Sequence, residues 1–158
     1  MPMSQDFSKY QEGDPPKPPA VVSGVIVSGD THRSERLPPG QSRTRKWPIL
    51  HWKRVPVVPT EDWRFFVRGE VEHPFELTWE EYQQLPRVKV FSDFHCVTRW
   101  SRLGNLWEGV SAAEIIRRAG VKSSAKFVIA HGFDDGFTTN LPIEYFADED
   151  VLLADLHD

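Results

Sequence analysis

The sequence predicts a single α+β domain, and three observations support this fold class. Short stretches rich in aromatic and β-branched residues outnumber the helical patterns, and the two kinds of stretch alternate without a repeat. The chain has 158 residues, of which 39% are hydrophobic, so it can bury one core of ordinary size. The helix-capping signals mark short helices only. We therefore expect a mixed sheet with few helices.

Four stretches have the composition of β-strands. Aromatic and β-branched side chains dominate them, and the last is almost continuously apolar, so we expect it to be buried. These strands are predicted over residues 63–71, 87–94, 126–131 and 151–156. Asp134-Asp135-Gly136 follows the third of them and predicts a hairpin turn.

Two helices are predicted from the polar residue that precedes each of them. Thr78 and Ser111 are each followed three positions later by a glutamate, which is the spacing of a capping box. Pro86 ends the first helix, and Gly120 is suited to the left-handed conformation that ends the second. A third, short helix is predicted over residues 143–147.

The distribution of proline divides the chain into an arm and a domain. Ten of the 13 prolines lie in residues 1–60, and residues 1–20 have few apolar side chains. We expect a flexible, proline-rich arm over residues 1–30 and a folded domain over residues 31–158. The last predicted strand reaches the end of the sequence with no later element to pair with. This pattern indicates a domain that is incomplete at its C-terminus.

The charge of the chain argues against one class of partner and leaves another open. The net charge is −4, so we do not expect a protein that binds nucleic acid through its overall charge. The charge is segregated, because residues 31–54 carry seven basic side chains against one acidic, whereas residues 121–158 carry two against eight. The basic stretch either faces a phosphate or lies over the acidic stretch.

Two features predict a cytoplasmic protein without a membrane partner. Every uncharged apolar run is far shorter than the ~18–20 residues that span a bilayer. Residues 1–14 contain neither an apolar h-region nor paired arginines, so they do not resemble an export signal.

Cys96 is the residue whose chemistry is most informative. It is the only cysteine, which excludes an intramolecular disulfide and a cysteine-based zinc finger. It follows a predicted strand, and positive charge from His95, Arg99 and Arg102 would favour the thiolate, which is the reactive form. The alternative is that Cys96 is a small buried hydrophobic residue.

Two chemistries would use a thiolate at this position. His95-Cys96 with Arg102 six residues after the cysteine has the spacing of a cysteine-based phosphatase, in which the thiolate attacks phosphorus. Residues 97–101 contain no glycine, however, and Leu103 follows the arginine, which does not suit a phosphate-binding loop. Alternatively, Cys96 binds a metal that brings its own organic sulfur ligands, because the six histidines form no cluster with metal-ligand spacing.

The segments around Cys96 resemble those of a known family. Phe94-His95-Cys96-Val97-Thr98-Arg99-Trp100-Ser101, followed by Trp107-Glu108-Gly109-Val110, is similar to the molybdopterin-binding domain of the sulfite oxidase family. The resemblance is closer to the bacterial branch that includes the catalytic subunit of the periplasmic methionine sulfoxide reductase. Residues 36–41 and 47–51 also match members of that branch, so the resemblance covers residues 36–157.

The resemblance implies a molybdopterin-dependent oxidoreductase of the sulfite oxidase type. Its mononuclear molybdenum would be held by the pterin dithiolene and by Cys96, and would transfer an oxygen atom to or from a small sulfite- or sulfoxide-like substrate. A separate electron-transfer protein is a possible partner. The residues that would contact the cofactor are His51, Trp52, Arg54, Cys96, Thr98, Trp100 and His131.

Other interpretations of these residues stay open. Trp100 and Thr98 also fit core packing and a strand-end hydroxyl. His51, Trp52 and Arg54 also fit a solvated basic turn, and His131 also fits a satisfied core or rim histidine. The family's later residues for the pterin phosphate would come after Asp158. A non-catalytic binding module that kept the fold is therefore a third interpretation, beside the oxidoreductase and the phosphatase.

Overall fold

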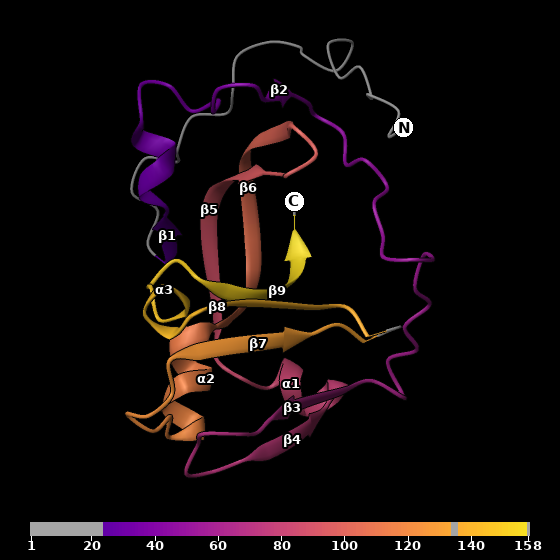
Figure 1. Cartoon of the computed structure of the whole chain (residues 1–158), viewed down its shortest axis with the longest axis vertical. Coiled ribbons are helices and arrows are strands. Elements are labelled where there is room, and N and C mark those ends of the chain that lie inside the picture. Colours follow the sequence, from indigo (N-terminus) through magenta and orange to yellow (C-terminus); the bar gives the residue numbers. More distant parts are fainter. Residues whose placement is uncertain (1–23, 134–135, 158) are drawn as a thin grey trace. The chain divides into compact units, whose positions relative to one another are not determined.

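A computed structural model describes residues 24–133 and 136–157 of the chain (Figure 1). The described residues fall into two compact units. Unit 1 combines the described residues up to Pro48 with Val88–Gly109 and the last strand from Ala154 onwards, and unit 2 combines Ile49–Arg87 with Val110–Leu153. The mixture of strands with a few short helices confirms the predicted α+β class.

Unit 1 is organised by a five-stranded sheet. Its strands follow the order β1-β5-β6-β2, and β9 also pairs with β6. The pairs β1–β5 and β2–β6 are parallel, with Ile26 opposite Val90 and Ser42 opposite Trp100. The strand bounds are Val25–Val27 for β1, Ser42–Arg43 for β2, Arg87–His95 for β5, Trp100–Ser111 for β6 and Leu152–His157 for β9; a 3₁₀ helix, η2, covers Gly29–His32.

The long strand β6 is not predicted by the sequence, because it buries polar residues. Ser101 and Asn105 are completely buried in it, next to the apolar Leu103. Asn105 is satisfied there, since its Nδ2 donates to the carbonyl oxygens of Ser92 (3.1 Å) and Arg102 (2.8 Å). Hydrophobic alternation therefore fails as a signal for this strand, although its backbone pairs on both sides.

The described residues of unit 2 form two hairpins and three helices. The hairpins are antiparallel, β3 (Arg64–Val67) with β4 (Phe75–Thr78) and β7 (Phe127–His131) with β8 (Thr138–Pro142). The helices are α1 (Trp79–Gln83), α2 (Ala112–Ala119) and α3 (Ile143–Phe146). The buried core consists of Tyr82, Leu85, Val110 and Ile115, and the Tyr82 hydroxyl donates to the Leu153 carbonyl at 2.7 Å.

The capping signals place α1 and α2 as predicted. Thr78 accepts a hydrogen bond from the Glu81 amide (3.2 Å), and the Glu81 carboxylate accepts one from the Thr78 amide (2.8 Å). Ser111 accepts from the amide of Glu114 at 3.1 Å. Gly120 ends α2 with φ of 61°, the left-handed conformation that favours glycine.

Three expectations need comment. Of the arm expected over residues 1–30, residues 1–23 lie outside the described part of the chain, but Val25–Val27 form β1, so the ordered domain begins before residue 31. The run of β-branched residues explains this strand. The last strand is confirmed but is not buried, since Leu156 is 57% exposed. The hairpin between β7 and β8 is confirmed by their register, while Asp134 and Asp135 lie outside the described residues.

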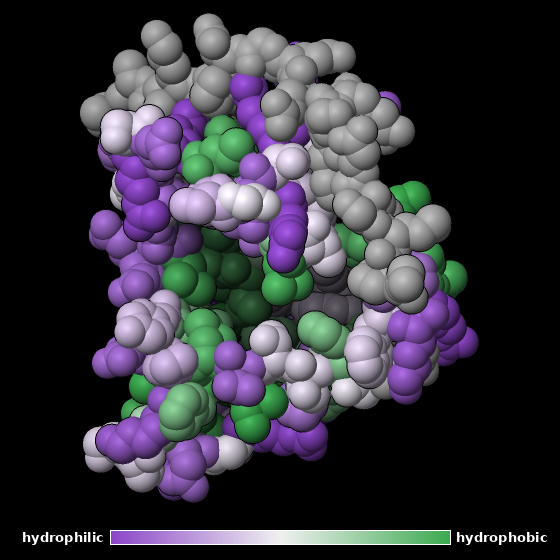
Figure 2. Space-filling model, turned by 45° about the horizontal axis from the view of Figure 1, so that its top comes forward, coloured by the Kyte–Doolittle hydropathy of each residue, from purple (hydrophilic) through white to green (hydrophobic). Residues whose placement is uncertain are grey.

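The surface carries apolar side chains on both units. Figure 2 shows green patches among the purple polar surface. The large exposed hydrophobic residues include Phe94 and Val97 in unit 1 and Trp52, Phe127 and Ile129 in unit 2. Among the described residues, no helix is both long enough and apolar enough to cross a bilayer.

Candidate functional site

Cys96 lies in the tight turn that connects β5 to β6, and its side chain is partly exposed. The Arg99 amide donates to the Cys96 carbonyl (3.0 Å), and the Cys96 amide donates to the Trp100 carbonyl (2.9 Å). Arg99 has φ of 70°, so a residue other than glycine occupies the left-handed region at the last loop position before β6. Such strain persists only where the surroundings hold it, and it is concentrated at functional sites.

The sulfur of Cys96 has a hydroxyl neighbour and an open flank. Its Sγ lies 3.2 Å from the Thr98 hydroxyl oxygen, so the structure brings these two predicted site residues together. Val97, between them, is 94% exposed. Cys96 is thus not the buried hydrophobic residue of the alternative interpretation, and its sulfur is accessible to a ligand.

A polar network fixes the turn from the side of β2. Gln41 Nε2 donates to the Cys96 carbonyl (3.0 Å), and Gln41 Oε1 accepts from the Ser101 hydroxyl (3.2 Å). That hydroxyl also lies 2.8 Å from His95 Nδ1. The backbone amide of Ser42 donates to the Arg99 carbonyl at 2.9 Å. Sequence reasoning did not assign a role to Gln41, although it ends one of the segments that carry the family resemblance.

An aromatic cluster of unit 1 packs behind the turn. Trp100 is only 3% exposed and stacks on Phe94, with ring centroids 5.4 Å apart. Trp47 contacts both rings and also Trp107 and His157 edge-on or tilted, at centroid distances of 5.1 to 5.7 Å. Among the described residues, neither buried indole nitrogen of Trp47 and Trp100 has a hydrogen-bond partner. Trp100 therefore supports the turn through packing.

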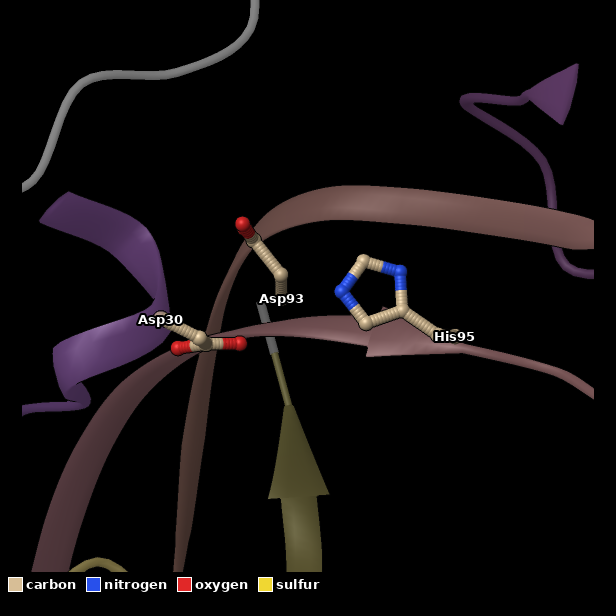
Figure 3. Close-up of side chains that lie close together, drawn as sticks. All are labelled: Asp30, Asp93 and His95. Atoms are coloured by element: carbon tan, nitrogen blue, oxygen red, sulfur yellow. The ribbon is translucent and has the colours of Figure 1, made fainter. Parts of the chain in front are cut away.

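A charged cluster lies next to the same turn (Figure 3). Asp30, Asp93 and His95 each offer a ligand atom within 4.8 Å of the others, and one ring nitrogen of His95 points toward the carboxylates. Arg36 binds the buried Asp93 carboxylate through two bonds of 2.8 and 2.6 Å, and the Gly104 amide donates to it at 2.8 Å. These hydrogen bonds raise the pKa of Arg36, against the opposing effect of burial. The Arg36 guanidinium thus supplies the positive charge that pairs with the buried Asp93 carboxylate.

The remaining predicted cofactor contacts belong to unit 2. His51, Trp52 and Arg54 are exposed in one loop, whose Lys53 has φ of 59°. The Trp52 ring lies 6.1 Å from that of Phe137, next to the residue that opens β8. His131 ends β7 opposite that same residue, Thr138. The structure therefore brings Trp52 and His131 to the same end of the β7–β8 hairpin.

The turn geometry does not support the phosphatase interpretation. The amides of Cys96 and Arg99 donate to backbone carbonyls of the hairpin, so they do not converge on a phosphate. The Arg102 guanidinium hydrogen-bonds the Asn105 side chain and the Arg45 carbonyl, and it lies 5.0 Å from the Trp47 ring centroid. The arginine of the predicted motif is therefore committed to the fold.

The thiol of Cys96 and basic side chains of the same unit suit a cofactor that combines a sulfur-bound metal with a phosphate. An accessible thiol is a suitable single protein ligand for a metal that already has sulfur ligands. Three exposed basic side chains, Arg45, Lys46 and Arg99, belong to the same unit and are suited to a phosphate.

Comparison with known proteins identifies a family. The family model described as oxidoreductase molybdopterin binding domain matches residues 52–157. An uncharacterized oxidoreductase, YuiH of Bacillus subtilis, is 44% identical over 135 residues, which cover 82% of this chain and 67% of YuiH. The catalytic subunit of protein-methionine-sulfoxide reductase, MsrP of Campylobacter jejuni, is 33% identical over 93 residues, which cover 59% of this chain and 29% of MsrP.

A solved structure shares the fold. The sulfane dehydrogenase SoxCD from Paracoccus pantotrophus matches with a TM-score of 0.57 and 22% identity, over 65% of this chain and 31% of that one. The chain thus spans about a third of the length of SoxCD and of MsrP. The predicted resemblance is confirmed, and the cofactor of the family is molybdopterin. The chain belongs to the oxidoreductase family that carries the molybdopterin-binding domain.

Proposed function

We propose that this protein transfers an oxygen atom to or from a small sulfite- or sulfoxide-like substrate at a mononuclear molybdenum bound by Cys96. The observation that carries the proposal is the accessible sulfur of Cys96 in a turn held by Gln41. The relatives give secondary support, because the names of MsrP and SoxCD both refer to sulfur compounds. Sulfite and methionine sulfoxide are therefore the first substrates to test.

The residues of the chain would hold and orient the cofactor. The bound molybdopterin would supply the two-electron oxygen-atom chemistry. Thr98 is positioned to donate a hydrogen bond to the Cys96 thiolate, which stabilises its negative charge. We further propose that His51, Trp52, Arg54 and His131 contact the pterin, with Trp100 supporting the turn from behind.

The reaction also needs an electron-transfer partner. Two electrons leave or enter the site in each turnover, and a chain with one cysteine cannot hold them in an intramolecular dithiol pair. We propose that a separate electron-transfer protein exchanges them. A stopped-flow experiment that measures reduction or reoxidation of the molybdenum-loaded protein by an added electron-transfer protein would identify such a partner.

Metal analysis of the protein from a molybdenum-replete host tests the proposal. We expect about one molybdenum and one pterin per chain, as a cofactor domain requires. Cys96→Ser should lose the thiolate-to-metal absorption and the activity. Val97→Ser, which makes the same residue at the exposed neighbouring position, should keep both.

Two results would contradict the proposal. Wild-type protein without molybdenum or pterin would favour the non-catalytic binding module. Full activity of Cys96→Ser with an unchanged spectrum would remove Cys96 as the ligand.

A further inference from the structure

We infer that Gln41 is a positioning residue that fixes the Cys96 turn and, through Ser101, the proton of His95. The inference deepens the proposed function, on which its consequence for the metal site rests. It depends on three side chains and one backbone carbonyl of unit 1 that are joined by hydrogen bonds in the order His95–Ser101–Gln41–Cys96 O.

The local sequence places Gln41 rigidly. The Gln41 amide donates to the Pro38 carbonyl at 3.1 Å, and Gly40 has φ of 76°. Proline followed by glycine at the two central positions of such a four-residue turn is the signature of a type II β-turn. The next amide, that of Ser42, donates to Arg99 in the Cys96 turn. The base of the Gln41 side chain is thus held on both sides, so its amide group reaches the turn with little freedom.

The donors and acceptors of these three hydrogen bonds have only one consistent arrangement. A carbonyl oxygen only accepts, so the group that faces Cys96 O must be the NH₂ of Gln41, and its oxygen must face Ser101. The single hydroxyl proton of Ser101 then goes to Gln41 Oε1. His95 Nδ1 must therefore carry a proton and donate it to Ser101 Oγ, at 2.8 Å.

This donor–acceptor direction has consequences both at the Cys96 carbonyl and at the His95 ring. At one end, the Cys96 carbonyl accepts from Gln41 as well as from Arg99, which stabilises a turn that contains a strained residue. At the other end, the proton on Nδ1 orients the His95 ring, and Figure 3 shows one ring nitrogen directed at Asp30 and Asp93. Without Gln41, Ser101 can donate to Nδ1 instead, and a proton on Nε2 can then bind a carboxylate.

The test compares Gln41→Leu with Gln84→Leu, both in metal-free protein. Gln84 is exposed at the end of α1 in unit 2 and provides the same chemical change away from the site. Because Cys96 is the only thiol, iodoacetamide labelling reports on this turn alone. We expect labelling to accelerate about fivefold in Gln41→Leu, the effect of one lost hydrogen bond on the population of open turns. Gln84→Leu should match the wild type.

Nitrogen-15 NMR of the histidine rings tests the donor–acceptor direction of these hydrogen bonds. At alkaline pH, where imidazole is neutral, the wild-type His95 signal should show the proton on Nδ1, and Gln41→Leu should move it toward Nε2. Ser101→Ala should remove the hydrogen bond that keeps the proton on Nδ1 of His95, so the proton should move toward Nε2. It should leave labelling near the wild-type rate, because it keeps the Gln41–Cys96 bond. A purely structural role would not separate the two readouts in this way.

The outcomes distinguish this inference from the proposed function. A wild-type ring protonated on Nε2, or wild-type labelling and tautomer in Gln41→Leu, would overturn the inference even if the protein contains molybdenum. If Gln41→Leu does not fold, the wild-type tautomer and Ser101→Ala still decide it. Absence of molybdenum from the wild type would overturn the proposed function and leave these measurements valid.

Discussion

Replacing Arg36 by methionine should reveal how strongly the fold depends on the charge of Asp93. The Asp93 side chain is completely buried and Arg36 is 11% exposed, with two hydrogen bonds between them. Methionine keeps most of the length of the arginine stem but removes the guanidinium. The carboxylate would then keep the Gly104 amide as a donor while losing its buried countercharge.

The magnitude follows from the burial of the pair. Removal of one partner of a buried ion pair costs about 3–5 kcal/mol, because the other charge stays desolvated. The Gly104 amide still solvates Asp93, so we expect the lower end, about 3 kcal/mol. With a urea dependence of roughly 2 kcal/mol per molar for a chain of this size, the unfolding midpoint should fall by about 1.5 M.

Urea titration followed by circular dichroism and tryptophan fluorescence provides the assay. Arg117→Met is the matched control, because Arg117 pairs with Glu114 on the surface of α2 and its side chain is 70% exposed. The control should unfold close to the wild-type midpoint, since exposed pairs stabilise little. Equal midpoints for Arg36→Met and Arg117→Met would refute the reasoning that burial makes the first pair important.

Two further predictions concern α2. Gly120→Ala should destabilise the protein by about 1–2 kcal/mol, because φ of 61° disfavours a Cβ, and this Cβ would lie 3.2 Å from that of Glu72. Thermal unfolding measures this loss, with Gly29→Ala as the control because its Cβ would meet open space. Equal unfolding midpoints for the two variants would contradict the prediction. Glu114→Gln should cost less than about 1 kcal/mol at pH 7. Hydrogen bonding to Arg117 lowers the pKa of Glu114, so this stabilisation is present above the ordinary glutamate pKa and is lost as pH falls through the lowered value. The gap between the two proteins should therefore close below about pH 4, as melting curves between pH 7 and 3 would show, and a constant gap would refute it.

Local signals in the sequence predict much of unit 2. Thr78 and Ser111 cap the helices α1 and α2 because a side-chain oxygen can bond an amide only three residues away, so the partners are close in sequence. Gly120 ends α2 for a similar local reason. The hairpin of β7 and β8 follows from two apolar stretches with a turn between them.

The site is predicted only in part. The motif around Cys96 indicates the thiol and its neighbour Thr98, and the structure places both in one turn. The contacts of Gln41 with Cys96 and of Arg36 with Asp93 join residues 55 and 57 positions apart. The hydrophobic periodicity of a sequence predicts local elements and cannot predict such distant contacts. The roles of His51, Trp52, Arg54 and His131, and the cytoplasmic location, stay predictions.

The sequence by itself determined the family, the fold class and the thiol, because motifs, capping residues and a unique cysteine are properties of neighbouring residues. Only the tertiary structure decided that β6 buries Ser101 and Asn105, that Gln41 fixes the turn and that Arg36 neutralises Asp93. The physical reason is that a polar side chain is buried only when a distant part of the chain supplies its hydrogen-bond partner.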